Sequence, residues 1–301
     1  MTMNNNVYIA TLPRSGSTLL GMILNNNARV FHMGESSYWG KLKPSEIFCS
    51  CGETCCEVLE AVYKRASNLP EVKAIYDACN QIDRQEEPGK IYHSFSLPSQ
   101  DDNVMISETA IAANLEAGCI GLEQLADIFR QLTGRDVIVD NTKNIRFAEC
   151  LVERQWRIIV MTRDPRGIVN SSKNAGLRKG VPRPVAMKIP VLINFATRAL
   201  GLIASPSILL VRYEDLCQSP KSEMEKVCHF LDISYADGML KFRNDNGHTL
   251  MGNRMRFGGE ENVVEDKSWT TQLSEEEIDL LQSNNELTEL YHQLGYQLKG
   301  G

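Results

Sequence analysis

The sequence feature that most constrains the fold lies near the start of the sequence. It is an apolar segment that is followed at once by a glycine-containing turn and an amphipathic stretch. Residues 7–12 read Val-Tyr-Ile-Ala-Thr-Leu and predict a buried first strand, whereas residues 18–26 predict a helix with its leucines turned inward. A helix start offers unpaired backbone N–H groups and a positive dipole end to an anion. In the connecting residues, Arg14 to Thr18, Arg14 supplies a positive charge and Gly16 lets the backbone approach a ligand closely. The serines Ser15 and Ser17 and the threonine Thr18 lie beside them, and Ser17 and Thr18 supply hydroxyl donors. The sequence therefore predicts a phosphate-binding loop between strand and helix.

This loop differs from the one that nucleoside triphosphatases use. Those proteins place a lysine directly before the Ser or Thr at the helix start, whereas this chain has Ser17 before Thr18 and carries its cation earlier, at Arg14. Because no lysine can reach a β- or γ-phosphate, hydrolysis of ATP or GTP is disfavoured. A P-loop kinase of a small metabolite that uses Mg-ATP is the alternative, with Asp140 as its candidate magnesium ligand.

Apolar runs of strand length alternate with stretches of helical period along the chain. The further strand candidates are residues 30–32, 136–139, 157–162 and 208–211. This alternation is typical of an α/β fold with a mostly parallel sheet flanked by helices. We expect a single domain over residues 1–301, with a variable insertion at about 40–135 and a Gly- and Asn-rich loop at about 243–268.

Composition limits the partners and the compartment. The chain has 32 Lys and Arg against 38 Asp and Glu, a net charge of −6, which disfavours a nucleic-acid partner. The longest apolar stretch, residues 186–211, is interrupted by Lys188, Pro190, Arg198 and Pro206, so we expect no membrane insertion. Nine cysteines without an export signal indicate reduced thiols and a cytoplasmic protein. The oligomeric state is not indicated.

A second phosphate-binding element follows the strand candidate at 157–162. Arg163 ends that strand, Asp164 and Pro165 predict a capped helix start, and Ser171 comes eight positions after the arginine. Arg163 and Ser171 can therefore reach one phosphate. The two elements, in this order, resemble the 5′-phosphosulfate and 3′-phosphate sites of sulfotransferases that use 3′-phosphoadenosine 5′-phosphosulfate (PAPS).

Further segments extend the resemblance to this family. The residues 139–143, Val-Asp-Asn-Thr-Lys, are similar to a segment of bacterial and tyrosyl-protein sulfotransferases, and 212–216, Arg-Tyr-Glu-Asp-Leu, to another. Residues 252–257, Gly-Asn-Arg-Met-Arg-Phe, resemble the family's loop that closes over the nucleotide, although Arg254 stands where the family usually has proline. The matches run from about Val7 to Trp269, whereas residues 56–136 match no motif.

The resemblance implies a P-loop-like sulfotransferase fold and a PAPS donor. It implies that the hydroxyls of the first loop bind the 5′-phosphate, that Tyr213 helps hold the nucleotide and that Arg254 and Arg256 clamp the 3′-phosphate. The implied nucleotide-binding residues are Arg14, Ser15, Gly16, Ser17, Thr18, Arg163, Ser171, Tyr213, Arg254 and Arg256.

Sulfuryl transfer resembles in-line phosphoryl transfer and needs a base, cations on the moving group and a stabilised leaving group. Tyrosyl-protein sulfotransferases are similar to this chain after the first loop without a gap, and their catalytic glutamate falls on Glu35. His32 is the competing base, because the cytosolic small-molecule branch uses histidine. Lys143 and Arg14 are the expected electrophilic partners, so no metal is required. The expected acceptor is a hydroxyl or amine of a small molecule or carbohydrate.

Four cysteines lie within eight residues, at Cys49, Cys51, Cys55 and Cys56. Four thiolates can hold a structural zinc, but typical zinc knuckles use two separated pairs, and this spacing is compact. We expect reduced thiols that pack in the protein, with a structural zinc or a labile disulfide as alternatives. Sulfuryl transfer needs no catalytic thiol.

Overall fold

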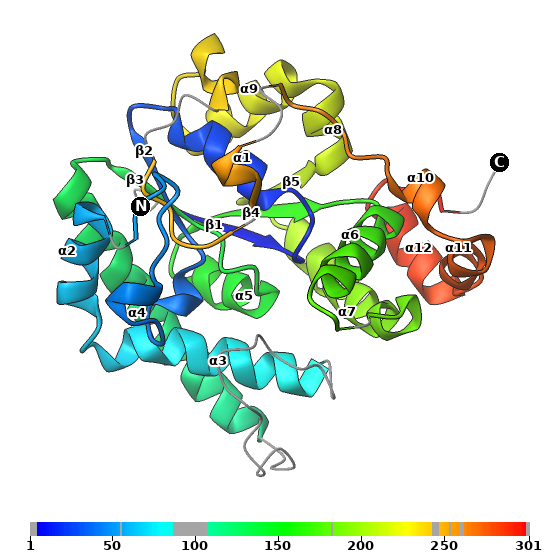
Figure 1. The fold of residues 1–301 in the computed structure, drawn as a ribbon, viewed down its shortest axis with the longest axis horizontal. Coiled ribbons are helices and arrows are strands. Elements are labelled where there is room, and N and C mark those ends of the chain that lie inside the picture. The colour runs from blue at the N-terminus through cyan, green and yellow to red at the C-terminus, as the bar shows by residue number, and fades with distance from the viewer. Residues whose placement is uncertain are drawn as a thin grey trace.

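The computed structural model describes residues 5–54, 56–86, 107–181, 183–242, 247–252, 254–258 and 262–298. Within these residues, five parallel strands form one sheet in the order β2-β3-β1-β4-β5 (Figure 1). The strands are β1 Asn6–Thr11, β2 Val30–Gly34, β3 Val137–Asp140, β4 Arg157–Thr162 and β5 Ile208–Arg212. The predicted α/β fold with a parallel sheet is thereby confirmed.

Helices cover both faces of this sheet (Figure 1). On one face lie α1 Ser17–Asn25, α8 Tyr213–Gln218 and α9 Pro220–Leu231. The other face is covered by α2 Glu57–Ala66, α3 Pro70–Glu86, α4 Glu108–Thr133, α5 Ile145–Glu153, α6 Pro165–Arg178 and α7 Ile189–Ile203. The chain ends with α10 Trp269–Gln272, α11 Glu275–Gln282 and α12 Asn285–Gln293. The 3₁₀ turns are η1 Ser36–Tyr38, η2 Pro44–Glu46, η3 Val185–Lys188, η4 Asp237–Leu240 and η6 Arg254–Phe257.

Two apolar cores result from the alternation of side chains along the strands. Tyr8 and Ala10 of β1 face the core under α4 and α5, whereas Val7 and Ile9 face the core under α1 and α9. All four side chains are fully buried. Burial on both faces explains why the strands read as continuous apolar runs in the sequence.

The unmatched middle of the chain forms helices beside β2. Phe129 of α4 stacks on Phe31 of β2 with ring centroids 5.0 Å apart, and Trp39 lies edge-on to Phe129 at 6.0 Å. Trp39 is almost fully buried, so this region shares the core of the sheet. The helices of the predicted insertion therefore share this core, with α4 packed against β2 and with α2 and α3 packed against α4.

By length and composition, one helical stretch among the described residues, Val185–Ile203, is apolar enough to cross a membrane. Its buried side includes Leu192, Phe195 and Ala199, which join the core beneath the sheet. On its outer side Arg198 pairs with Glu149 of α5 at 2.8 Å. Within its most apolar window, 28% is buried in the structure.

Candidate functional site

The carboxyl ends of the parallel strands meet at one edge of the sheet, and the predicted site residues follow these ends. Residues 12–16 follow β1, Glu35 follows β2, and Lys143 comes shortly after β3. Arg163 follows β4 directly, and Tyr213 follows β5. In open α/β sheets ligands bind outside the carboxyl ends of the strands. The fold thus brings five separate segments to the place where a ligand site is expected.

The phosphate loop has the backbone geometry that an anion site requires. Gly16 is the N-cap of α1 with φ 94°, and Arg14 also has a positive φ of 79°. A Cβ on Gly16 would lie 2.5 Å from Cδ2 of Tyr213 and 2.9 Å from Cε of Met161, so glycine is required there. Among the described residues no side chain caps α1, and the buried hydroxyl of Ser15 has no hydrogen-bond partner. The start of α1 therefore keeps donors for a ligand.

Glu35 and Lys143 form an ion pair at the edge of the site. Their side chains are 16% and 13% exposed, so the pair is largely shielded from water. Tyr8 fixes this region, because its hydroxyl donates to the carbonyl of Asn144 at 2.8 Å and accepts from its N–H at 3.1 Å. Lys143 itself has φ 68°, an unfavourable conformation for a side-chain-bearing residue. Two residues that the sequence analysis predicted from different segments thus meet in space.

A segment from the predicted closing loop lies over this ion pair. Leu250 bridges to Gly34, and its carbonyl accepts from the N–H of Glu35 at 3.1 Å. Gly252 has φ 105°, and a Cβ built there would lie 3.4 Å from Oγ1 of Thr18 and 4.0 Å from Oε1 of Glu35. The segment therefore joins the phosphate loop to the candidate base.

Arg163 lies on the other side of the phosphate loop. Its guanidinium donates to the carbonyl of Arg14 at 3.0 Å and to the carbonyl and carboxylate of Asp266 at 2.8 and 3.1 Å. A Cβ on Gly167 would lie 2.8 Å from Nε of Arg163, so this face of α6 lies against the guanidinium. Ser171 lies one helical turn after Gly167, on the same face. The predicted pair is therefore on one side of α6, although no hydrogen bond between the two is recorded among the described residues.

Tyr213 connects the two phosphate elements. Its ring carries the Arg163 guanidinium at 4.4 Å from the centroid, and the same ring blocks any side chain at position 16. Its hydroxyl accepts from the N–H of Asp266 at 2.9 Å. Burial raises the pKa of Tyr213, which is therefore a neutral phenol at physiological pH.

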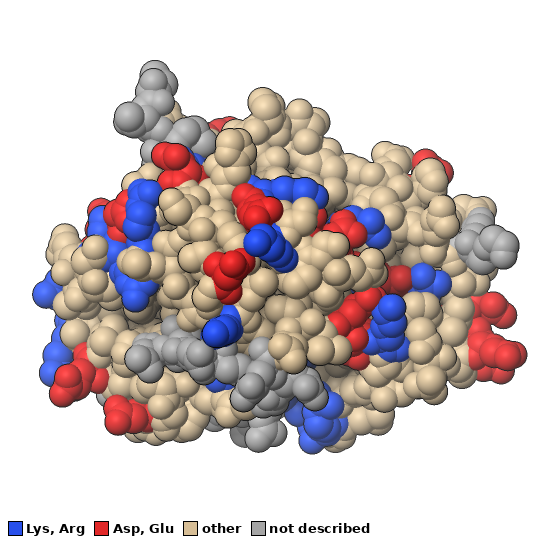
Figure 2. Space-filling view, turned by 90° about the horizontal axis from the view of Figure 1, so that it is seen from above, with Lys and Arg blue, Asp and Glu red and all other residues tan. Residues whose placement is uncertain are grey.

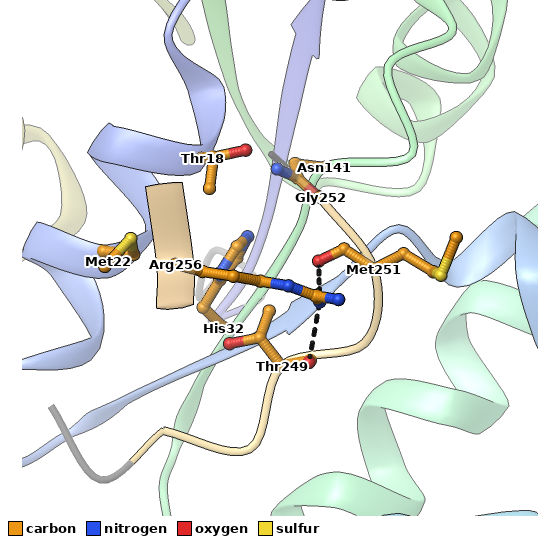
Figure 3. A pocket seen from close by; sticks show the side chains of 8 residues that line it. All are labelled: Thr18, Met22, His32, Asn141, Thr249, Met251, Gly252 and Arg256. Atoms are coloured by element: carbon orange, nitrogen blue, oxygen red, sulfur yellow. Dashed lines mark hydrogen bonds between the residues drawn. The ribbon is translucent and has the colours of Figure 1, made fainter. Parts of the chain in front are cut away.

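Arg256 lies in a small pocket behind the closing segment (Figure 3). Its guanidinium donates to three main-chain carbonyls, those of Thr249, Met251 and Phe48. Burial lowers the pKa of Arg256, while the nearby Glu35 opposes that shift. In this structure the guanidinium of Arg256, a predicted phosphate clamp, therefore holds its own loop. The side chain of Arg254, the other predicted clamp, lies outside the described residues.

His32 lines the same pocket and is deeply buried (Figure 3). Its ring packs against α1, since a Cβ on Gly21 would lie 2.4 Å from Cε1 of His32. Burial, followed by the positive charges of Lys143 and Arg256, lowers the pKa of His32 to about 3. The Asn141 amide opposes the shift, but its geometry falls short of a hydrogen bond. His32 is a neutral, enclosed imidazole.

Asp140, the candidate magnesium ligand of a kinase, is fully buried. One of its carboxylate oxygens accepts from the N–H of Thr142 at 2.8 Å. Burial raises its pKa to about 6. Asp140 therefore shapes the chain after β3.

Three basic residues that the sequence analysis did not single out gather beside Arg14. Arg178 is the last residue of α6, and Lys179 and Arg183 follow the helix. Burial lowers the pKa of Arg14, and the positive charges of Arg178 and Arg183 lower it further. The sequence signal that could have found them is the run of basic residues near the end of the helix that carries the second phosphate-binding element.

Figure 2 shows the face of the molecule that is seen from above. There, basic side chains lie among acidic ones in small mixed groups, within the part of the face that is not grey (Figure 2). With a net charge of −6, the chain attracts anions only through local groups such as the one around Arg14.

The predicted cysteine cluster contains a partner that the sequence analysis missed. Three cysteines, Cys49, Cys51 and Cys56, lie close to His248. The three cysteines are free thiols in the structure. Cys55 lies outside the described residues. The histidine is 192 residues away from Cys56, so no local spacing indicated it.

The chain is similar to proteins of one known family. The sequence model of the sulfotransferase family matches residues 6–237, most of the chain. The chain therefore belongs to the sulfotransferase family, as the resemblance of its motifs implied.

A solved sulfotransferase domain is similar in fold to this chain, and two further solved structures match it with lower TM-scores. The sulfotransferase domain from the curacin biosynthetic pathway has 16% identity and a TM-score of 0.53, with 99% of this chain and 100% of that chain covered. The sulfotransferase domain of the Synechococcus PCC 7002 olefin synthase has 17% identity, a TM-score of 0.47 and coverage of 99% and 98%. A mouse sulfotransferase, SULT7A1, solved in complex with PAP, has 10% identity, a TM-score of 0.46 and coverage of 98% and 90%. No curated protein matches the chain.

Proposed function

We propose that this sulfotransferase takes its sulfuryl group from PAPS and transfers it to a hydroxyl or amine of a small-molecule or carbohydrate acceptor. The observation that carries the proposal is the shielded Glu35–Lys143 pair, which lies beside the phosphate loop and beneath Gly252. A carboxylate and an ammonium at a loop that offers N–H donors are the groups that an in-line transfer needs.

In the proposed mechanism the acceptor enters between Glu35 and the sulfuryl group. Glu35 accepts the acceptor proton as the acceptor oxygen or nitrogen attacks sulfur, and the S–O bond to the 5′-phosphate breaks. Lys143 moves from Glu35 to the bridging oxygen and stabilises the charge that forms on the leaving phosphate. Arg14 and the N-terminal N–H groups of α1 neutralise the 5′-phosphate.

The 3′-phosphate of the nucleotide is assigned to Arg163 and Ser171. Arg163 is already oriented by the Arg14 carbonyl and the Tyr213 ring, so little side-chain entropy is lost on binding. Nη2 of Arg163 donates to the carbonyl and to the carboxylate of Asp266, and we propose that the phosphate replaces this carboxylate. Arginine suits the exchange because its planar fork matches phosphate geometry.

Two alternatives are less well supported. A Mg-ATP-dependent kinase needs a loop lysine, which the sequence lacks, and a metal ligand, whereas Asp140 is buried and bonded to Thr142. His32 as base needs access to the acceptor, but its ring is packed behind α1.

The experiment measures transfer of labelled sulfate from PAPS to a panel of phenols, amines and hexosamines. Glu35→Gln removes the base but keeps the shape of the side chain, so transfer should fall about 10²- to 10⁴-fold. Binding of adenosine 3′,5′-bisphosphate should persist. The matched control is Glu225→Gln, an exposed residue of α9 that should retain full activity. Unchanged transfer by Glu35→Gln would remove Glu35 from the mechanism.

A further inference from the structure

Four potential metal ligands converge at one point between two distant segments of the chain. Nδ1 of His248 lies 3.6 Å from Sγ of Cys49 and 3.2 Å from Sγ of Cys56. Together with Sγ of Cys51, all four ligand atoms lie within 4.8 Å of one another. Cys49 and Cys56 are buried, whereas Cys51 is exposed.

The 3.6 Å separation between Nδ1 of His248 and Sγ of Cys49 equals that of a tetrahedral zinc site, and the 3.2 Å separation from Sγ of Cys56 is slightly shorter. Zn–S bonds of about 2.3 Å and Zn–N bonds of about 2.0 Å at tetrahedral angles put sulfur and nitrogen about 3.6 Å apart and two sulfurs about 3.8 Å apart. The donor set, three cysteines and one histidine, is one that structural zinc sites use. A disulfide would join only two of the sulfurs and would leave the third cysteine and the imidazole without a role.

The chain around the cysteines forms a compact turn suited to ligation. The N–H of Cys49 donates to the carbonyl of Glu53 at 3.0 Å, and the N–H of Gly52 donates to the carbonyl of Cys49 at 3.1 Å. Gly52 has φ 92°, which lets the turn reverse. The N–H of Cys51 points at Sγ of Cys49 at 3.5 Å, a contact that stabilises a thiolate ligand.

We propose that Cys49, Cys51, Cys56 and His248 bind a structural zinc ion that fastens the closing segment to the body of the protein. His248 begins the segment that covers Glu35, and Cys49 already forms a bridge with Leu250. The Ser50 hydroxyl donates to the carbonyl of Gly247 at 2.6 Å and accepts from the N–H of Thr249 at 2.9 Å. The metal thus fixes a contact between segments about 200 residues apart, and this role does not depend on the identity of the donor or of the base.

The test measures zinc in the purified full chain, kept under reducing conditions, by elemental mass spectrometry. One equivalent per chain is expected, and replacement by cobalt should give thiolate-to-cobalt charge-transfer bands with tetrahedral d–d bands. In competition with a chelator, the His248→Ala and Cys49→Ser variants should each keep about tenfold less bound zinc than the wild type, or less still. The matched controls are His229→Ala, an exposed histidine of α9, and Cys79→Ser of α3, which should keep the wild-type content.

Hydrogen exchange supplies a readout that is independent of activity. Removing the zinc should increase exchange at residues 247–252 and 48–54 and leave β1 unchanged. Three results would overturn the proposal: a wild-type chain that takes up no metal after incubation with zinc, an intact mass lower by two hydrogens that shows a disulfide, or full metal retention in His248→Ala. The Glu35→Gln variant should lose transfer activity but keep its zinc. This result would show that the zinc site and the proposed function can be tested separately.

Discussion

At the scale of single residues, Lys143 combines an unfavourable backbone with a shielded charge. Its φ of 68° costs free energy for a residue with a Cβ, and its ammonium pairs with Glu35. Asn144, held by the Tyr8 hydroxyl, starts α5 directly afterwards and thereby imposes this conformation. Strain of this kind persists where the surroundings determine it, which is common at functional sites.

His32 gives a prediction for pH dependence. The unfolded chain binds a proton at His32 near pH 6.5, whereas the folded protein does so only near pH 3. The stabilisation from the neutral imidazole is present above pH 6.5 and is lost as the pH falls toward 3. The free energy of unfolding of the wild type should therefore decrease by a few kcal/mol more than that of His32→Gln over this window.

Denaturant unfolding at several pH values checks this difference. Asp140, whose pKa is raised to about 6, has the opposite dependence, because its stabilising protonated form is lost as the pH rises through the window from about 4 to 6. It is present in both proteins, so its effect cancels in the comparison. Parallel acid slopes for the two proteins would show that His32 titrates normally in the folded state.

At the scale of elements, the unit of β1, phosphate loop and α1 depends on Gly16. Gly16→Ala combines an unfavourable φ with overlap against Tyr213 and Met161. Gly134→Ala is the matched control, because Gly134 also has a positive φ, 69°, but a Cβ there meets nothing within 4 Å. The control should lose about 1 kcal/mol, whereas Gly16→Ala should lose about 1–3 kcal/mol more and bind nucleotide weakly.

Thermal unfolding of both variants measures this difference. Equal losses would mean that the Tyr213 ring moves away freely and does not define the loop. Weak nucleotide binding with unchanged stability would mean that the overlap is relieved by displacing the phosphate loop alone.

Sequence patterns predicted the elements that depend on local chemistry. Asp164 accepts from the N–H of Arg166 at the start of α6, with Pro165 in the first turn, as the Asp-Pro signal indicated. The strand β3 is one residue later than expected, Val137–Asp140, because the polar Asp140 is buried at its end. The pairing of Glu35 with Lys143 and the approach of His248 to the cysteines had no local signal, since their partners are more than 100 residues away.

At the scale of the whole molecule, the C-terminal segment completes the core and supports the second phosphate element. The Tyr296 hydroxyl donates to Glu214 at 3.0 Å and lies 3.0 Å from the Thr162 hydroxyl. Glu214 in turn accepts from the N–H of Asp164 at 2.9 Å. A residue near the chain end thus helps to position the segment that carries Arg163.

Tyr296→Phe should therefore destabilise the protein by about 1–3 kcal/mol, because it leaves the half-buried Glu214 carboxyl with one partner fewer. Tyr291→Phe is the matched control. The Tyr291 hydroxyl is buried and has no hydrogen-bond partner among the described residues, so its removal should be neutral or stabilising. Chemical denaturation measures the free energy of unfolding of both variants. Similar values for the two variants would contradict the role assigned to Tyr296.

The most direct test of the PAPS-dependent mechanism is calorimetric titration with adenosine 3′,5′-bisphosphate, compared with ATP with and without Mg²⁺. We predict metal-independent binding of the bisphosphate that Arg163→Ala weakens about 10- to 100-fold. Arg198→Ala, which removes an arginine of α7 that pairs with Glu149 of α5, should bind like the wild type. Preference for Mg-ATP, with no binding of the bisphosphate, would contradict the donor assignment and favour the kinase.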